Sequence, residues 1–388
     1  MQYQETTSVS WFGRIKNSAV GALVGFFAII AMICLLFWNE GRAVTTARSL
    51  EEGAGIVISV DANSIDPANE GKLVHVTGRV VTNDKPSDPD FGITVTTLQL
   101  LRSVEMYQWI EETSSESTTS LGGSEEITTT YSYSTGWSEQ EHDSSNFRYP
   151  QGRDNPPMEI RRGYFPVESA SIGEFRLSSS VIAMIDNQEP LKLPESNEEA
   201  IQDVFGTAKR VHIVNGNIYL GNDPQNPQVG DYRVSYRVVP IGPASVIGRQ
   251  TGNGFTEYQT VAGDRLLLVN DGVLTAEQMF KDAERDNAIL TWVLRAAGVF
   301  FLVVGFSMVL GLLGVIADVI PFLGSIVRLG TGLVAWCLGT LVGTLTIAVA
   351  WFWYRPLVSL AVIIVGVAIS WYFGQRAKKK AGVTTAAA

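Results

Sequence analysis

The sequence predicts an integral membrane α-helical protein with four transmembrane helices, one before and three after a β-rich α+β extracytoplasmic domain. Two observations lead to this fold class. Charged residues make up only 18% of the 388-residue chain, and long uncharged apolar runs occur near both ends. The segment between the runs alternates apolar and polar residues, a pattern that indicates half-buried strands.

The first apolar run covers residues 18–38 and is long enough to cross the hydrocarbon core of a bilayer as a helix. A removable signal peptide has a shorter apolar centre and ends in small residues, whereas this run ends in Phe37 and Trp38. A buried core helix of this length would carry more polar residues. The run therefore indicates a permanent membrane anchor.

Three further apolar runs follow a polar region of about 250 residues, which is large enough to bury its own core. The predicted spans are residues 296–317, 329–351 and 357–373. The remaining predicted segments are an N-terminus (1–17), an external domain (39–295), a cytoplasmic turn (318–328), an external turn (352–356) and a basic tail (374–388).

Basic residues at the ends of the spans predict the orientation. Arg14 and Lys16 precede the first span, and four Arg or Lys residues follow the last one. Lys and Arg favour the cytoplasmic side, so both termini are expected in the cytoplasm and the domain in the periplasm or the endoplasmic-reticulum lumen. Arg42 and Arg48, just beyond the first span, oppose this assignment.

Composition excludes several classes of partner and site. The net charge is −10 although the flanks are basic, so the domain is acidic and is not expected to bind nucleic acid. Cys34 and Cys337 both lie in predicted spans, which leaves the domain without a disulfide or a cysteine metal site. Residues 39–295 contain no N-x-S/T sequon, which favours a bacterial source.

Strand-like segments are separated by loops rich in Pro and Gly. The clearest is residues 231–239, in which Tyr and Val alternate with Arg and Ser. The other candidate strands are residues 72–81, 92–101, 104–112, 211–220 and 264–272. The Ser- and Thr-rich segment 113–136 is either a disordered loop or a long hairpin turning at Gly122 and Gly123, and the hairpin is favoured.

Two segments carry helix start signals. Residues 196–210 open with Ser196 and Glu199 in capping-box spacing, and residues 275–298 open with Thr275 and Gln278 in the same spacing. The second has no Gly or Pro before Gly298, so it is expected to continue into the second span.

The sequence contains no recognisable catalytic, cofactor or metal motif. His75, His142 and His212 are not spaced as metal ligands, and the aspartates at 84, 88 and 90 lack the distal Glu of a calcium loop. No charged residue lies at mid-depth in a span, which argues against ion translocation. We therefore expect no enzyme activity, no metal and no cofactor.

Small and aromatic residues in the spans indicate helix packing and the membrane interface. Gly21 and Gly25, and likewise Gly339 and Gly343, have the G-x-x-x-G spacing that lets helices approach closely, either within one chain or between chains. Tryptophans near the ends of the spans predict an interface belt at Trp11, Trp38, Trp292, Trp351, Trp353 and Trp371. Residues 9–16 could lie flat on the membrane as a short amphipathic anchor.

Several blocks in order resemble the transmembrane protein 43 (LUMA) family over nearly the whole chain. They are "FWNEGRAVTTARSLEEG" (37–53), "PANEGKLVHVTG" (67–78), "SVEMYQWIEE" (103–112), "YSYSTGW" (131–137), "GDYRVSY" (230–236), "TWVLRAAG" (291–298) and "WYRPL" (353–357). The resemblance implies four spans, cytoplasmic ends and a large lumenal domain. It implies residence in the endoplasmic reticulum and inner nuclear membrane in a eukaryote, with emerin and lamins as partners, and in the inner membrane of a bacterium, which has neither partner.

Three functions are compatible with these observations. The favoured one is a non-enzymatic scaffold that organises membrane-protein complexes by self-association, with membrane lipids and other membrane proteins as partners. The first alternative is a channel or a channel regulator. The second is an external domain that binds lipid or is an enzyme, in which Trp109 and the glutamates at 105, 111 and 112 would form the edge of a cleft.

Overall fold

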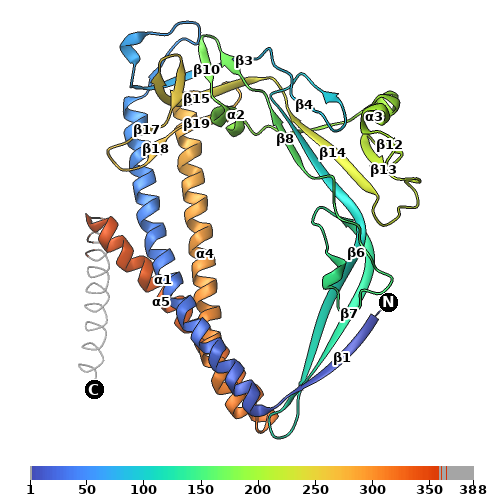
Figure 1. The fold of residues 1–388 in the computed structure, drawn as a ribbon. Helices are drawn as coiled ribbons and strands as arrows, with labels where there is room; N and C mark the ends of the chain where they lie inside the picture. The colour runs from blue at the N-terminus through green and yellow to red at the C-terminus, as the bar shows by residue number, and fades with distance from the viewer. Residues whose placement is uncertain (1, 358–359, 361–363, 365–388) are drawn as a thin grey trace, which may run out of the picture. The chain divides into compact units, whose positions relative to one another are not determined.

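A computed structural model describes residues 2–357, 360 and 364 of the chain (Figure 1). Its α-helices are α1 (Trp11–Ile56), α2 (Ser179–Met184), α3 (Glu198–Phe205), α4 (Ala276–Ala317) and α5 (Pro321–Tyr354). Short 3-10 helices cover Pro67–Asn69, Ser144–Asn146 and Glu195–Asn197.

The described residues form two compact units. Of the described residues, the β-rich unit contains 2–7, 49–116 and 127–283, and the helical unit contains 8–48, 117–126, 284–357, 360 and 364. The boundaries fall inside α1, α4 and the β-hairpin around residue 120, so these elements contribute residues to both units.

Eight strands form the first sheet in the described part of the chain, and the long strand β6 organises it. The order is β1 (Gln2–Val9), β7 (Glu125–Ser138), β6 (Gln99–Thr119), β14 (Tyr232–Val239), β13 (Asn217–Leu220) and β12 (Val211–Val214), with β11 (Glu189–Leu191) on β14 and β8 (Gly163–Pro166) on β6. Residues 99–106 of β6 pair with β14. Its first four residues also pair with β8 on the opposite edge.

The second sheet closes on itself. Its order is β19 (Leu268–Asp271), β15 (Pro243–Thr251), β16 (Gly254–Thr256), β10 (Phe175–Leu177), β9 (Ala170–Ile172), β3 (Leu73–Val81) and β2 (Ile58–Ser59). Strand β15 also pairs with β3, so β15, β16, β10, β9 and β3 form a continuous ring. Two short ribbons pair β4 (Ser87–Asp88) with β5 (Ile93–Thr94) and β17 (Tyr258–Gln259) with β18 (Arg265–Leu266).

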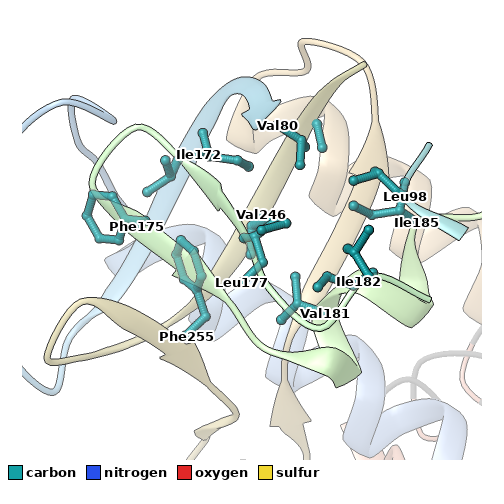
Figure 2. Packing of buried hydrophobic residues seen from close by; sticks show 14 of the residues in the cluster. Val80, Leu98, Ile172, Phe175, Leu177, Val181, Ile182, Ile185, Val246 and Phe255 are labelled. Carbon is teal, nitrogen blue, oxygen red and sulfur yellow. The ribbon is translucent and has the colours of Figure 1, made fainter. Parts of the chain in front are cut away.

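Apolar side chains from each strand of this ring fill its interior (Figure 2). Val246 of β15 and Ile172 of β9 are fully buried, and the rings of Phe175 and Phe255 stack with their centroids 5.3 Å apart. Helix α2 adds Val181 and Ile182 to this core. The first sheet has a separate core on the face that α3 covers, and a third cluster packs Met279 and Phe280 against the ring.

The predicted strands at residues 72–81 and 231–239 and the long hairpin are confirmed. The hairpin turns where predicted, with Gly122 and Gly123 in positive-φ conformations that favour glycine. The two strands predicted at residues 92–101 and 104–112 are not separate. Residues 99–119 form one continuous strand, β6, which includes the end of the first and all of the second. The prediction of a single strand over residues 264–272 is wrong, because the segment splits into β18 and β19.

Residues 211–220 form a hairpin and not the predicted single strand. Asn215 and Gly216 both adopt positive φ, at 54° and 84°, and they join β12 to β13. This geometry is that of a type I′ turn, for which Asn-Gly is the strongest short signal. The sequence therefore contained the signal, but the alternating residues on either side obscured it.

One predicted helix start is confirmed and the other is wrong. Gln278 N donates to Thr275 Oγ1 at 3.3 Å, Thr275 N donates to Gln278 Oε1 at 2.9 Å, and α4 continues unbroken to Ala317. The segment 196–210 is α-helical only over Glu198–Phe205, and no side chain caps this helix. It ends early because Gly206 leaves the helix at a φ of 85°.

Three described helices are long and apolar enough to cross a membrane: Trp11–Ile56, Ala276–Ala317 and Phe322–Tyr354. All three extend beyond the predicted apolar runs. The predicted fourth span at 357–373 lies outside the described residues, apart from 357, 360 and 364.

The predicted turn at 318–328 is shorter in the structure. Only residues 318–320 separate α4 from α5, because Pro321 occupies the first helical turn of α5, where its missing N–H costs nothing. The predicted external turn at 352–356 is likewise reduced, since α5 continues to Tyr354 and is capped at Arg355.

The N-terminal residues form strand β1, which the sequence analysis did not predict. β1 pairs with β7, and the ring of Tyr3 stacks on that of Tyr149 at 4.4 Å. Glu5 Oε1 accepts hydrogen bonds from Arg148 Nε at 2.8 Å and Tyr149 Oη at 2.9 Å. Trp11 already begins α1, so residues 9–16 do not form the separate surface anchor that was considered.

The orientation of the termini across the membrane remains a prediction. Its placement of the N-terminal residues does not fit the pairing of β1 with β7. It places residues 1–17 and 39–295 on opposite sides of the bilayer, whereas β1 and β7 are neighbours in one sheet. The basic-residue rule weighs each span's flanks separately. The rule therefore contains no information about the pairing of β1 with β7, which lie more than 100 residues apart in the sequence.

Cysteine labelling tests this point. We expect Ser8→Cys and Leu121→Cys, made in a chain with Cys34 and Cys337 replaced by Ala, to react with an impermeant maleimide from the same side of sealed vesicles. Both positions are exposed, and both lie at ends of elements that the sheet brings together. Labelling from opposite sides would show that β1 does not pair with β7 in the membrane.

His75 gives the β-rich unit a pH dependence. Its Nε2 lies 3.0 Å from the Leu274 carbonyl oxygen and its Nδ1 lies 3.1 Å from Ser59 Oγ, an arrangement that suits the neutral ring with Nε2 protonated. Burial lowers the pKa of His75 below 6.5, and the hydrogen bond to Leu274 opposes this only in part. The unfolded chain therefore takes up a proton at a higher pH than the folded chain does.

Stability should consequently fall as the pH decreases through about 6.5, the ordinary pKa of histidine. Melting curves between pH 7.5 and 5.5 are expected to show a smaller loss for His75→Gln than for the unaltered chain. Equal losses in the two proteins would mean that His75 does not contribute. His142→Gln is the matched control.

Candidate functional site

A buried carboxylate joins the three long helices. Glu40 of α1 directly follows the apolar run and is only 2% exposed. Arg295 of α4 donates from Nε to one carboxylate oxygen at 2.6 Å and from Nη2 to the other at 2.8 Å. Trp351 of α5 donates its indole N–H at 2.8 Å. Bidentate, charge-assisted bonds of this kind are among the strongest in proteins.

Gly41 permits the close approach of α5 beside this carboxylate. A Cβ atom at residue 41 would lie 2.6 Å from the ring of Tyr354. The absence of a side chain therefore lets the Tyr354 ring pack directly on α1. The glycine is a packing position in mid-helix, where it otherwise costs about 1 kcal/mol relative to alanine.

A second polar group involves the neighbouring residues Asn39 and Arg42 of α1. Arg42 donates to Asn287 Oδ1 at 2.9 Å, to Thr291 Oγ1 at 3.0 Å and to Asn39 Oδ1 at 3.3 Å. Asn39 is fully buried and donates to the Thr291 carbonyl oxygen at 3.2 Å. Among the described residues, the hydrogen-bond partners of the Arg42 guanidinium are all neutral oxygens, so its charge is held without a carboxylate.

A third polar cluster lies at the other end of the apolar section. Asp318 is fully buried and accepts hydrogen bonds from Arg14 at 2.6 Å and from Arg328 at 2.7 Å. Arg14 also pairs with Glu125 at 2.9 Å and donates to the Gly123 carbonyl oxygen at 2.7 Å. Along α1, Arg14 and Glu40 are separated by about 39 Å of helix rise. Polar clusters thus bracket an apolar section of about bilayer thickness.

A cavity of about 330 Å³ lies beside the Glu40 cluster, within the helical unit. Arg295 at its edge lies over the ring of Trp292 at 4.7 Å and over that of Trp351 at 5.6 Å. The lining residues are Ala43, Ala47, Glu284, Asn287, Ala288, Thr291, Trp292, Arg295, Trp351 and Arg355. The cavity therefore combines two guanidinium groups, two indoles, neutral polar side chains and the carboxylate of Glu284 at one end of the apolar section.

The glycines predicted to pack helices differ in their surroundings. A Cβ on Gly25 would lie 2.7 Å from the Gly305 carbonyl oxygen of α4. Cβ atoms on Gly339 and Gly343 would clash with Val303 and Val299, also of α4. Beyond the adjacent part of its own helix, no described atom lies within 4 Å of a Cβ on Gly21. Three of these glycines thus lie at contacts between helices of one chain.

The predicted interface tryptophans are also of two kinds. Trp38, Trp292 and Trp353 are mostly exposed, at 56%, 66% and 72%. Trp11 and Trp351 are partly buried, and Trp11 donates its indole N–H to the Val315 carbonyl oxygen at 3.0 Å. Trp371 lies outside the described residues.

The residues of the predicted cleft edge in the β-rich unit have different neighbours. Glu105 pairs with Arg233 at 3.5 Å, whereas Glu111 accepts hydrogen bonds from Tyr133 Oη at 2.5 Å and from Arg148 N at 2.6 Å. Glu112 is exposed and Trp109 lies against Arg153. Burial and the bond to Glu111 raise the pKa of Tyr133 to about 12. Glu105, Glu111 and Trp109 thus each contact a different group.

One of the three aspartates at 84, 88 and 90 takes part in a buried ion pair. Asp88 is fully buried, and Arg102 donates to both of its carboxylate oxygens at 2.8 Å. Tyr236 Oη donates to Asp88 at 2.7 Å, and Asp90 is the second carboxylate on Arg102. No group of three or more His, Cys, Asp or Glu residues in the described part of the chain is arranged to hold a metal ion.

The Glu40 cluster makes a prediction about stability. Arg295→Met should destabilise the chain by about 3–5 kcal/mol, because it leaves a buried carboxylate without its charge partner. Arg285→Met is the matched control on the same helix. Its pair with Asp286 is exposed, so the expected cost is below about 1 kcal/mol.

Unfolding in mild detergent, followed by circular dichroism, measures both effects. Adding Glu40→Gln to Arg295→Met should restore part of the loss, since no buried charge then remains. Equal losses for the two single variants would contradict the assignment.

The chain was compared with known proteins. The family model for transmembrane protein 43 matches residues 106–356. The human transmembrane protein 43 is 36% identical over 368 residues, which cover 92% of this chain and 89% of the relative. The mouse protein is 36% identical over 357 residues, covering 89% and 87%. The Drosophila melanogaster homolog is 29% identical over 363 residues, covering 89% and 92%.

No solved structure is significantly similar to the chain. The match to the family model and the identity to its animal members extend over most of both sequences. The residues of the Glu40 cluster in α4 and α5 lie inside the matched range. The chain therefore belongs to the transmembrane protein 43 family of membrane proteins.

Proposed function

We propose that this protein is a non-enzymatic, multi-pass membrane scaffold that organises membrane-protein complexes by self-association. The observation that carries the proposal is the environment of Gly21. It lies one helical turn before Gly25, which packs against α4, yet beyond the adjacent part of its own helix no described atom lies within 4 Å of a Cβ atom placed on it. The notch at Gly21 is open to a helix of a second copy.

Apolar side chains surround this notch. Val20, Leu23 and Val24 are more than half exposed, and so is Phe27. Small residues on an apolar helix allow a second helix to approach closely and to gain van der Waals contacts. In the other G-x-x-x-G pair, residues of α4 fill the space beside both Gly339 and Gly343. The open G-x-x-x-G position on α1 is therefore available for self-association.

The other functions considered gain less support. In the described residues, charged side chains of the long helices gather at the ends of the apolar section and do not line its middle. In the β-rich unit, Glu105 and Glu111 have separate structural partners. These observations favour a role in assembly over a pore or a catalytic domain.

Substitution of Gly21 tests the proposal. Gly21→Leu should fill the notch and reduce the population of oligomers by about tenfold, the effect of losing roughly 1.4 kcal/mol of helix contact. The folded monomer should be unaffected because the side chain enters open space. Native mass spectrometry in mild detergent measures the subunit distribution.

Two matched variants complete the test. Gly311→Leu, at an equally open glycine on α4, should leave the oligomers unchanged. Gly25→Leu should instead lower the melting temperature of the monomer, since residue 25 contacts α4. An unaltered chain that is monomeric in native membranes, or a Gly21→Leu chain with a normal subunit distribution, would refute the proposal.

A further inference from the structure

We infer that the cavity beside Glu40 binds the headgroup of a membrane glycerophospholipid that carries a single phosphate. This goes beyond the scaffold function and does not depend on self-association. It rests on the position of the cavity, on the groups that line it and on the balance of charge around it.

The cavity lies at the level where lipid headgroups meet the hydrocarbon core. On α1, its residues Ala43 and Ala47 follow the apolar run that ends at Trp38. On α4, Thr291 and Arg295 directly precede the next run. A headgroup in the cavity would therefore leave its acyl chains beside the apolar helices.

The lining offers donors suited to a phosphate. Arg295 and Arg355 present guanidinium groups, which match phosphate oxygens in geometry and charge. The Thr291 hydroxyl is already engaged, since it donates to the Asn287 carbonyl oxygen at 2.7 Å. Asn287 keeps one amide hydrogen besides the one that it donates to the Ala43 carbonyl oxygen, and Trp292 supplies the indole that is typical of membrane interfaces. Basic pockets between membrane helices are known to bind lipid phosphates. The volume of about 330 Å³ is in the range of small-molecule sites.

The surrounding charge favours an anion. Glu40 already neutralises Arg295 through two hydrogen bonds. Arg42, behind the lining residues Asn287 and Thr291, has only neutral partners among the described residues, so its positive charge is uncompensated. The carboxylate of Glu284 lies on the lining about 10 Å of helix rise beyond Thr291. It disfavours a second phosphate there and limits the ligand to a monophosphate lipid.

Neighbouring apolar residues provide a surface for the acyl chains. Leu290 and Val293 of α4 are about half exposed, and so is Val349 of α5. These residues adjoin the lining positions Thr291, Trp292 and Trp351 in the sequence. A free phosphate ion would make no use of this surface, so the arrangement favours the lipid as the source of the phosphate.

Native mass spectrometry of the full chain, titrated with phosphatidylglycerol, tests the inference. Diacylglycerol with the same acyl chains lacks the phosphate, and inorganic phosphate lacks the chains. We expect phosphatidylglycerol adducts in excess of diacylglycerol adducts, and no displacement by millimolar inorganic phosphate. Equal retention of the two lipids would overturn the site, and displacement by inorganic phosphate would show an anion site without lipid specificity.

Three variants locate the binding. Arg355→Gln should weaken phosphatidylglycerol binding about tenfold, the usual scale for one charge-assisted hydrogen bond. Arg285→Gln, an exposed arginine of the same helical unit outside the cavity, should have no effect. Ala288→Phe fills the cavity from an exposed lining position without altering charge, so it should reduce binding even if Arg355→Gln impairs folding. Unchanged binding in Ala288→Phe would overturn the inference.

Discussion

The helical unit depends on a single carboxylate, Glu40, held away from water between three helices. Removing a charge from water costs several kcal/mol, and only well-placed partners recover that cost. Here a guanidinium of α4 and an indole of α5 supply three hydrogen bonds to its two oxygens. Because each partner comes from a different helix, the pairing fixes how α1, α4 and α5 are rotated against one another.

This constraint explains features that otherwise appear unrelated. Gly41 must be small because the Tyr354 ring packs beside the carboxylate. Gly25 and Gly305 meet three to four turns away because the helix rotation set at Glu40 brings them face to face. The cavity on the same level is lined by residues of α1 and α4 and by Trp351 of α5, which also holds Glu40. The cluster around Asp318 closes the apolar section at its other end in a similar way.

Patterns that act within a short stretch of sequence could be predicted, and contacts between distant stretches could not. The apolar runs, the capping box at Thr275 and the hairpin turn at Gly122 each depend on local chemistry, and each was found. From the sequence, Arg42 is only a flanking charge and Glu40 has no recognisable role, since their partners lie about 250 residues later. The closed ring of strands and the pairing of β1 depend on contacts between distant segments, which neither periodicity nor composition encodes.

The pairing of β1 with β7 has a consequence for the synthesis of the protein. Val9 leaves the ribosome long before its partner strand, which ends at Ser138. At about 5–20 residues per second, the roughly 130 residues between them take about 6–26 s to make. During that interval the first apolar helix is already available for insertion while its leading strand has no sheet to join. Chaperone binding or a delay in insertion at this stage would thus determine whether the N-terminal strand reaches its place.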